Sequence, residues 1–480
     1  MKINALLSIW FVLLLSCTPE PMKAHFSIQD YTGSFNLDNI ASVREYTIHS
    51  NTEWKISNDD VQSWCTITPA QGARDDKISV SVTANTGKGR LATFKLTGKG
   101  ISAQTLQVQQ GEPYAATSAN EFPIIAWTGI EPENAYNKFI KMKNAGINTY
   151  LGWYDNVEIV KNVLDAAERA GVKIITSCPG LTAEPGQTVP ALMNHPALYG
   201  YHLADEPETG ELEQLGLKVQ QIQSLDNYHP CYINLYPNWA WGKEQYSSNV
   251  ALFLEKAPVP FLSFDNYPIV SIDGNPSILR PDWYRNLEEI AAAAKKHKIP
   301  FWAFALALSH RLDASYFYQV PTLPELRLQV FSNLAYGAQA IQYFTFHGIY
   351  IDNETEVYDR VKTVNQEVQK LTPVFLGATV TDVWHTGPVL PEGTRALGKL
   401  PDAIRSLSTE GTGAVVSLLE NKGQSYLVIV NKDYRNPMKL TIDTEASVSR
   451  LSKEGIPVPA TDTKLTVDPG NCIIYTWKKK

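Results

Sequence analysis

Residues 198–225 read LYGYHLADEPETGELEQLGLKVQQIQSL, and this stretch holds one complete strand-and-helix unit. Residues 198–204 form a short apolar run, which is typical of a buried strand. From Leu212 to Leu225 the apolar residues recur at helical spacing, which predicts an amphipathic helix. A strand followed by such a helix is the repeating unit of a parallel sheet.

The same unit recurs along the central part of the chain. We expect strands at 122–128, 149–154, 172–178, 198–204, 231–236, 261–267, 300–308 and 340–346. We expect helices at 135–144, 157–170, 189–194, 212–225, 283–297, 323–336 and 357–371. Eight strands over about 250 residues predict a (β/α)8 TIM barrel, with domain bounds 121–376. A doubly wound open sheet is the alternative, but no glycine-rich phosphate loop follows the first strand.

In a TIM barrel the functional side chains lie at the carboxyl ends of the strands. Here these ends are rich in aromatic, amide and carboxylate side chains and poor in basic ones. Such a set suits a neutral polyhydroxylated ligand, because aromatic rings stack on the apolar faces of sugars. The predicted ligand-binding residues are Trp127, Trp153, Tyr154, His202, Asp205, Asn234, Tyr236, Trp239, Asn266, Tyr267, His310 and His347.

Glu206, at the end of strand four, is the predicted general acid. Its carboxyl can protonate a glycosidic oxygen as the bond breaks, and burial among aromatic rings would raise its pKa toward the working range. A capping carboxylate at the start of the next helix is the alternative. Strict alternation along the strand would turn His202, Ala204 and Glu206 to the inner face. A local twist before Pro207 would present Asp205 as well.

Cleavage of a glycosidic bond usually needs a second carboxylate. The stretch around strand seven, FWAFALALSH at residues 301–310, contains no acid. Asp265 on strand six is the nearest substitute, either as a base or nucleophile or as a hydrogen-bonding ligand for a sugar. Weaker candidates are Asp155, Asp313, Asp352 and Glu354.

The turn Asp205-Glu206-Pro207 resembles the Asn-Glu-Pro signature of clan A glycoside hydrolases, with Asp205 in place of the asparagine. Segments 201–207, 232–237 and 335–339 are similar to Bacteroidetes TIM-barrel hydrolases related to family 42 β-galactosidases. The resemblance implies that Glu206 is the general acid/base. It also implies a nucleophilic glutamate after strand seven, which this chain lacks. Two functions therefore stand: a glycoside hydrolase, or a non-catalytic surface glycan-binding protein on a degenerate barrel.

Residues 24–113 alternate polar and apolar residues in short runs separated by turns, which predicts a small β-sandwich. Trp54 and the stretches 64–72 (WCTITPAQG), 90–94 (RLATF) and 108–111 (VQQG) resemble the BACON module, which is often found beside glycoside hydrolase domains. The resemblance implies either glycan binding or a spacer that lifts the next domain away from a membrane. Residues 111–120 form the expected linker.

The first residues resemble a bacterial lipoprotein signal. Lys2 precedes an apolar run from Ala5 to Leu15, and Ser16 and Cys17 follow it. The run is shorter than the about 20 residues that a spanning helix needs. We therefore expect residues 1–21 to be signal and anchor, with lipid on Cys17. The remainder would lie in the cell envelope, at the outer membrane, periplasmic or surface-exposed. A plain cleaved signal is the alternative.

The last segment, 377–480, loses helical periodicity and predicts an antiparallel β-domain. Segments 414–419 and 425–430 flank a turn, which predicts a hairpin. The net charge of −7, with no long basic block, argues against nucleic-acid binding. No metal-ligand spacing links the cysteines, so we expect no metal and no cofactor. We expect a monomer that acts on an oligo- or polysaccharide.

Overall fold

The computed structural model describes residues 23–29, 31, 33–37, 41–58, 62–85, 89–110, 121–351 and 356–479. Outside the described residues lie the predicted lipid anchor Cys17, the candidate acids Asp352 and Glu354, and the predicted linker 111–120. The chain divides into two compact units. The first comprises residues 1–35, 43–82 and 92–108, and the second comprises 36–42, 83–91 and 109–480.

The N-terminal strands form two antiparallel sheets, and the predicted β-sandwich is confirmed. The first sheet is ordered β1 (Phe26–Ile28), β3 (Ser42–Ser50), β7 (Asp76–Val82), β5 (Cys65–Thr68). The second is ordered β2 (Phe35–Leu37), β9 (Ile101–Gln110), β8 (Arg90–Gly98), β4 (Trp54–Ser57), β6 (Gln71–Gly72). Alternate side chains are buried along these strands, which is the pattern of a sheet with one face on a core. The core includes Ile48, Ile56, Val80, Leu96 and Val108.

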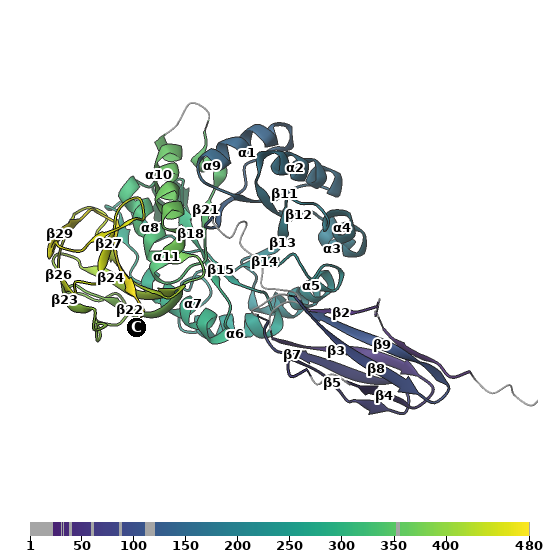
Figure 1. Cartoon of the computed structure of the whole chain (residues 1–480). Helices are drawn as coiled ribbons and strands as arrows, with labels where there is room; N and C mark the ends of the chain where they lie inside the picture. Colours follow the sequence, from purple (N-terminus) through teal and green to yellow (C-terminus); the bar gives the residue numbers. More distant parts are fainter. Residues whose placement is uncertain are drawn as a thin grey trace, which may run out of the picture. The chain divides into compact units, whose positions relative to one another are not determined.

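Eight parallel strands form the barrel of the second unit (Figure 1). They are β10 (Ile124–Trp127), β11 (Thr149–Trp153), β12 (Lys173–Ser177), β13 (Leu198–Asp205), β14 (Cys231–Asn234), β15 (Leu262–Phe264), β18 (Phe301–Leu306) and β21 (Ala340–Phe344). Their hydrogen-bonded order is β14-β13-β12-β11-β10-β21-β18-β15. A parallel bridge between Leu235 and Phe264 joins the two end strands. The sheet is therefore a closed TIM barrel, as predicted, and not an open doubly wound sheet.

The helices surround the strands on the outside of the barrel (Figure 1). Four have the predicted bounds: α1 (Ala135–Asn144), α2 (Val157–Ala170), α5 (Leu212–Leu225) and α7 (Trp283–His297). Two differ by a residue: α8 (Leu323–Ala335) and α10 (Glu356–Lys370). Short helical segments complete the layer: η1 (Pro132–Asn134), η2 (Thr209–Glu211), α9 (Phe346–Ile349) and α11 (Thr372–Phe375).

Two helical regions differ from the prediction. The predicted single helix at 189–194 is instead the pair α3 (Gly180–Ala183) and α4 (Pro185–Leu192). Helix α6 (Tyr246–Lys256), after strand five, was not predicted. Its start carries no side-chain cap and follows an aromatic loop, so the usual sequence signal of a helix beginning is missing there.

The loops after strands six and seven pair with each other in a small sheet. The first loop contains β16 (Ile269–Ile272) and β17 (Ile278–Leu279), and the second contains β19 (His310–Arg311) and β20 (Tyr316–Tyr318). The sheet order is β17-β16-β20-β19. It places Tyr318 and His310 beside the carboxyl end of the barrel. These pairs join two loops far apart in sequence, so no local pattern predicted them.

The C-terminal strands form a six-stranded and a three-stranded antiparallel sheet. The larger is ordered β22 (Thr379–His385), β24 (Ala414–Asn421), β25 (Gln424–Asn431), β30 (Cys472–Lys478), β27 (Ser449–Leu451), β28 (Pro457–Pro459). The smaller is ordered β23 (Ile404–Thr409), β26 (Met438–Thr444), β29 (Lys464–Val467). The predicted hairpin is β24–β25, and its turn places Lys422 and Gly423 at positive φ, as a tight hairpin turn requires. The Ser417 hydroxyl donates to the carbonyl of Ala335 in α8 at 2.6 Å, which ties the larger sheet to the barrel helices.

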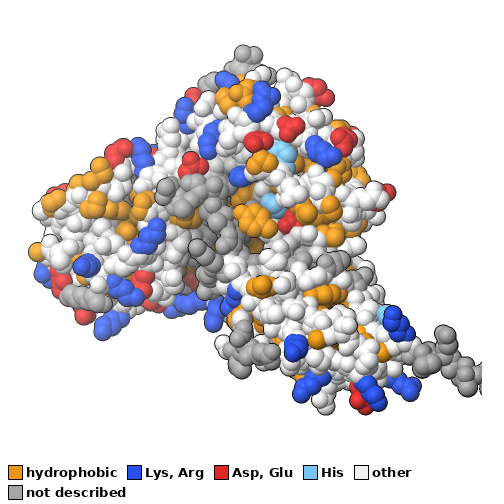
Figure 2. Space-filling model, turned by 45° about the vertical axis from the view of Figure 1, so that its right-hand side comes forward, with side chains coloured by type: hydrophobic (Ala, Val, Ile, Leu, Met, Phe, Trp, Pro, Cys, Tyr) orange, Lys and Arg blue, Asp and Glu red, His pale blue; other side chains and the backbone are white. Residues whose placement is uncertain are grey.

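The surface of the second unit carries both signs of charge. Basic and acidic side chains are interspersed over the barrel and the C-terminal sheets on the face drawn in Figure 2. Within the described part of the chain, none of the helices has both the length and the apolar content needed to span a bilayer.

Candidate active site

A cavity of about 380 Å³ opens at the carboxyl ends of the barrel strands. Ten of the fourteen predicted site residues line it: Trp127, Asp205, Glu206, Asn234, Tyr236, Trp239, Asp265, Asn266, Tyr267 and His310. The other lining residues were not predicted as site residues from the sequence; they are Pro237, Ala240, Phe304, Leu312, Tyr318 and Phe344. The cavity thus brings together side chains from strand ends that lie far apart in the sequence.

A break in strand pairing turns both Asp205 and Glu206 toward this cavity. The register of β13 with β14 shifts between His202 and Ala204, which is a bulge at Leu203. After the bulge Asp205 pairs with Asn234, so it no longer follows strict alternation. Glu206 then has φ of 51°, in the left-handed region that a residue with a side chain seldom adopts. The local twist that the sequence suggested is therefore present, and it turns the neighbouring carboxylates of Asp205 and Glu206 toward the cavity.

Asn234 bridges two of the acids. Its Nδ2 donates to Oδ1 of Asp205 at 3.1 Å and to Oδ1 of Asp265 at 2.9 Å. Because both oxygens bond to one nitrogen, they are no more than about 6 Å apart. Asn234 is only 2% exposed, so it contacts the two acids from the buried side of the cavity.

Glu206 and Asp265 form a second, closer pair, within hydrogen-bonding reach of each other. Burial, with the negative charge of Asp205, raises the pKa of Glu206 to about 7. Burial, with the charge of Glu206, raises the pKa of Asp265 well above its usual range. The pKa of Asp205 is also raised by burial, and the amide of Asn234 opposes this rise. Three carboxyls so close together cannot all ionise easily, so the cluster retains a proton near neutral pH.

Aromatic rings form much of the cavity wall. The Trp127 ring stands edge-on to Phe304, with centroids 5.1 Å apart. Tyr267 stacks on Phe344 at 5.9 Å. On the opposite loop, Trp239 is 37% exposed and lies over the guanidinium of Arg280 at 4.7 Å. These rings offer the apolar faces on which a sugar stacks.

Four predicted site residues do not line the cavity: Trp153, Tyr154, His202 and His347. His202 is instead packed between the Trp127 and Tyr232 rings, and burial lowers its pKa to about 4. Trp153 is 54% exposed and stacks on the outer side of His202 at 6.0 Å. The prediction for these two residues assumed that every side chain at a strand end reaches the cavity.

The other two residues have structural partners. The Tyr154 hydroxyl donates to the carbonyl of Ile130 at 3.2 Å. His347 is bonded to Thr345 through Nδ1 at 2.9 Å and packs on Gly129, where an added Cβ would meet the His347 Cβ at 2.4 Å.

The weaker acid candidates that the structure describes are also outside the cavity. Asp155 is exposed at the end of β11. Asp313 accepts hydrogen bonds from the backbone N–H groups of Ser315 and Tyr316, at 2.7 Å and 2.9 Å, so it holds the β19–β20 turn. Asp205 and Asp265 are therefore the two candidate acids that line the cavity together with Glu206.

The missed lining residues have different origins. Phe304 lies in the middle of β18 and Phe344 at the end of β21, and both face the barrel interior near its mouth. The alternation of β18 around Trp302 was the signal that could have found Phe304. Tyr318 and Leu312 come from the β19–β20 loop, whose pairing with β16 no sequence pattern predicted.

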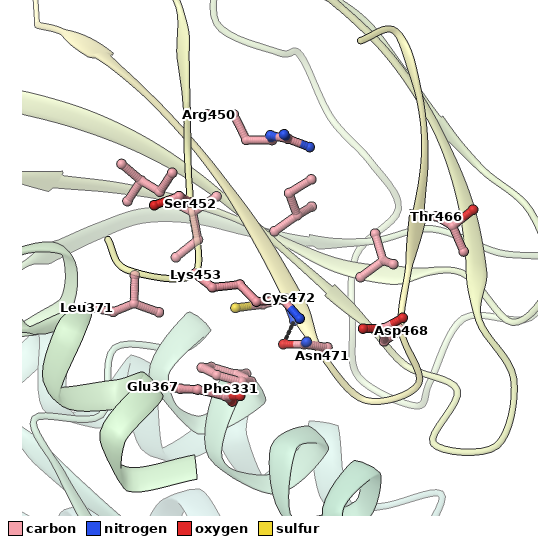
Figure 3. Close-up of a pocket in the computed structure, with 14 residues that line it drawn as sticks. Phe331, Glu367, Leu371, Arg450, Ser452, Lys453, Thr466, Asp468, Asn471 and Cys472 are labelled. Carbon is pink, nitrogen blue, oxygen red and sulfur yellow. Dashed lines mark hydrogen bonds between the residues drawn. The ribbon is translucent and has the colours of Figure 1, made fainter. Parts of the chain in front are cut away.

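A second cavity, of about 370 Å³, lies between the barrel helices and the C-terminal strands (Figure 3). Phe331 and Glu367 face it from α8 and α10, and Cys472 faces it from β30. Arg327 donates to Glu367 at 3.0 Å, and burial raises the pKa of the Cys472 thiol. Arg327 engages the Glu367 carboxyl and burial opposes ionisation of the Cys472 thiol, so the cavity at the barrel mouth is the stronger candidate site.

One group of possible metal ligands occurs among the described residues: Asp165, Glu168 and His195. His195 Nδ1 accepts from the backbone N–H of Ala197 at 3.1 Å, and Nε2 lies 3.0 Å from Asp165. Nε2 therefore keeps the proton and donates to the carboxylate. A metal needs an unprotonated ring nitrogen, so the arrangement fits an ion pair better than a metal site.

Solved structures similar to this chain include three glycoside hydrolases. One is a Bacteroides ovatus GH5 xyloglucanase in complex with a XXXG heptasaccharide, with 12% identity, a TM-score of 0.34, and coverage of 71% of this chain and 100% of that one. Another is a family 39 glycoside hydrolase from the gut symbiont Bacteroides cellulosilyticus WH2, with 10% identity, a TM-score of 0.44, and coverage of 95% and 100%. The third is the GH99 endo-alpha-mannosidase from Bacteroides thetaiotaomicron, with 14% identity, a TM-score of 0.33, and coverage of 45% and 67%.

Comparison of the sequence with curated proteins finds none that matches the chain. Comparison with family models finds a match in the N-terminal module. Residues 52–111 match the family BACON, described as "Putative binding domain, N-terminal". The resemblance of the N-terminal module to BACON is therefore confirmed over that range.

Proposed function

We propose that this protein is a glycoside hydrolase that cleaves O-glycosidic bonds of an extracellular oligo- or polysaccharide. The observation that carries the proposal is the carboxyl pair of Glu206 and Asp265 at the mouth of the barrel. A pKa of about 7 lets Glu206 hold a proton at neutral pH, which a general acid must do. The aromatic wall supplies the surface that holds a sugar ring beside it.

Asp265 is the proposed nucleophile. An inverting enzyme keeps its two carboxyls about 6.5–9.5 Å apart to admit a water, whereas a retaining enzyme keeps them at about 5–5.5 Å. Glu206 and Asp265 lie within hydrogen-bonding reach of each other, which supports the shorter separation and so a retaining mechanism. A bound sugar would part the two carboxyls, and the N–H of Asn234 would favour the ionised form of Asp265.

The proposed reaction has two steps. Asp265 forms a bond to the anomeric carbon while the bond to the leaving oxygen breaks, and Glu206 gives its proton to that oxygen. Glu206, now a carboxylate, then takes a proton from a water that attacks the anomeric carbon and releases Asp265. Asp205, Asn266, His310, Tyr236 and Trp239 are proposed to bind the sugar.

Several broader predictions are part of this proposal. The barrel is proposed to be related to the family 42-like hydrolases, on the strength of the Asp205-Glu206-Pro207 turn. Cys17 is proposed to carry a lipid that holds a monomeric protein in the cell envelope. The BACON module is proposed to bind glycan or to act as a spacer.

A second function remains in view, because strand seven offers no acid. A glycan-binding protein on this barrel would hold sugars without cleaving them. A screen of the purified protein against plant and host polysaccharides, with released reducing ends resolved by product sizing, tests the proposal. Release of oligosaccharides supports hydrolysis, and binding without release supports the second function.

A further inference from the structure

A chain of buried hydrogen bonds lies directly beneath the acids. Gln342 on β21 donates through Nε2 to the Ser263 Oγ at 2.8 Å, and it accepts from the Tyr232 hydroxyl at 2.6 Å. Ser263 in turn donates to Oδ1 of Asn234 at 2.9 Å. Tyr232, Ser263 and Gln342 are each 0% exposed. We call these three residues the relay; they come from strands five, six and eight.

The Asn234 and Gln342 amides set the direction of the hydrogen bonds along the relay, and the Tyr232 and Ser263 hydroxyls also lie 2.7 Å apart, where either oxygen can donate. Tyr232 has one proton, which it gives to the Gln342 carbonyl oxygen. Ser263 has one proton, which it gives to Asn234, while its oxygen accepts from Gln342. The amide oxygen of Asn234 therefore points to Ser263, and its NH₂ group points to Asp205 and Asp265. If the amide were reversed, an oxygen would face two carboxylates.

We propose that Tyr232, Ser263 and Gln342 are positioning residues that lock the orientation of Asn234, so that its NH₂ group favours the charged forms of Asp205 and Asp265. This inference rests on the proposed function for its catalytic meaning. Its physical basis is that a donor aimed at a carboxyl favours the charged form. Asn234 donates to these two acids, so the relay opposes the rise in pKa that burial imposes on them.

The fold does not require polar side chains at the relay positions. The opposite face of the same strand offers a comparison: Tyr343 on β21 is 0% exposed and donates to Asn365 of α10 at 2.8 Å, away from the cavity. An apolar core at the relay positions would close the barrel as well, and it would leave no buried polar group to satisfy. A polar network at this depth, ending on the acids, is therefore explained by the orientation that it imposes.

The test uses Ser263→Ala and Tyr232→Phe in the full chain. Ser417→Ala and Tyr343→Phe are matched controls, since each also removes a buried hydroxyl that makes a hydrogen bond. With the most readily cleaved glycan, we expect the relay variants to lose about ten-fold in kcat with little change in KM. We also expect the acidic limb of the kcat/KM profile to move to higher pH, because Asp265 loses part of the donation that favours its charge. The controls should keep the wild-type profile.

A second readout does not depend on turnover. The side-chain carboxyl ¹³C resonances of Asp205 and Asp265, assigned with Asp205→Asn and Asp265→Asn, are titrated in each protein. Higher midpoints in the relay variants than in the controls support the inference. Unchanged midpoints and an unchanged pH profile in both folded relay variants overturn it. If the wild-type protein cleaves no glycan, the proposed function fails, but the titration still decides whether the relay sets the charge of the two acids.

Discussion

Glu206, at the end of β13, lies within hydrogen-bonding reach of Asp265, which follows β15 two strands along the barrel. Burial raises the pKa of both acids; the charge of Asp205 raises the pKa of Glu206 further, and the charge of Glu206 raises that of Asp265. This relationship makes the pair able to hold and release a proton near neutral pH. The predictions below follow from it and from the cavity around it.

Asp265→Asn is expected to lower kcat by more than about 1,000-fold if Asp265 is the nucleophile. A small external anion such as azide should then restore turnover of an activated aryl glycoside, because it replaces the missing carboxylate. Asp313→Asn is the matched control, since Asp313 only holds a turn. Loss of activity without azide rescue would assign Asp265 to sugar binding instead.

Activity is expected to fall as the pH rises through about 7. The acid must be protonated to act, and Glu206, with a pKa of about 7, loses its proton in that range. The basic limb of a kcat/KM profile measures this directly. A basic limb several pH units higher would mean that another group supplies the proton.

Glu206→Gln is expected to stabilise the fold above neutral pH. A carboxyl with a raised pKa opposes folding where the unfolded chain would already ionise it, so the effect is absent at pH 4, grows between about pH 4.5 and pH 7, and is constant above that. After allowance for solvent screening, the gain in unfolding free energy at pH 8 is about 1 kcal/mol. Thermal unfolding at pH 5 and pH 8 measures it, and an equal gain at both would contradict the electrostatic origin.

Trp239→Ala is expected to raise KM about five-fold with little change in kcat, because an exposed ring beside the cavity contributes ground-state stacking. Trp153→Ala is the comparison, since Trp153 is more exposed but lies outside the cavity. Initial rates over a range of substrate concentrations separate the two constants. A larger effect at Trp153 would place the sugar on the other side of the barrel mouth.

Cys17→Ser is expected to move the protein from the membrane fraction to the soluble fraction of the cell envelope. A lipid needs the thiol for attachment. Fractionation followed by immunoblotting measures the change. Retention in the membrane fraction would show that another feature holds the protein there.

The barrel was predictable because its signal is local. Each strand is a short apolar run and each long helix has a clear periodicity, so helices such as α2 and α5 begin and end where the pattern says. Helix α6 lacked a cap, and the β16–β20 sheet joins two loops distant in sequence. Such features depend on contacts that no window of sequence contains.

The site was predictable in part for the same reason. The strand-end rule correctly placed Glu206 and Asp265 at the barrel mouth, because it needs only the order of strands. It failed at His202, because the ring is buried among the Trp127, Trp153 and Tyr232 rings and does not reach the cavity. It could not show that Asn234 joins two acids, since that contact depends on the register between neighbouring strands.

The most direct test of the account compares wild-type protein with Glu206→Gln on one glycan that the wild type cleaves. Reducing-end release and ligand affinity are measured on the same samples. The account predicts that the variant loses cleavage by more than about 1,000-fold and binds the glycan with an affinity close to that of the wild type. A variant that cleaves at the wild-type rate, or a wild-type protein that binds glycans and cleaves none of them, would contradict it.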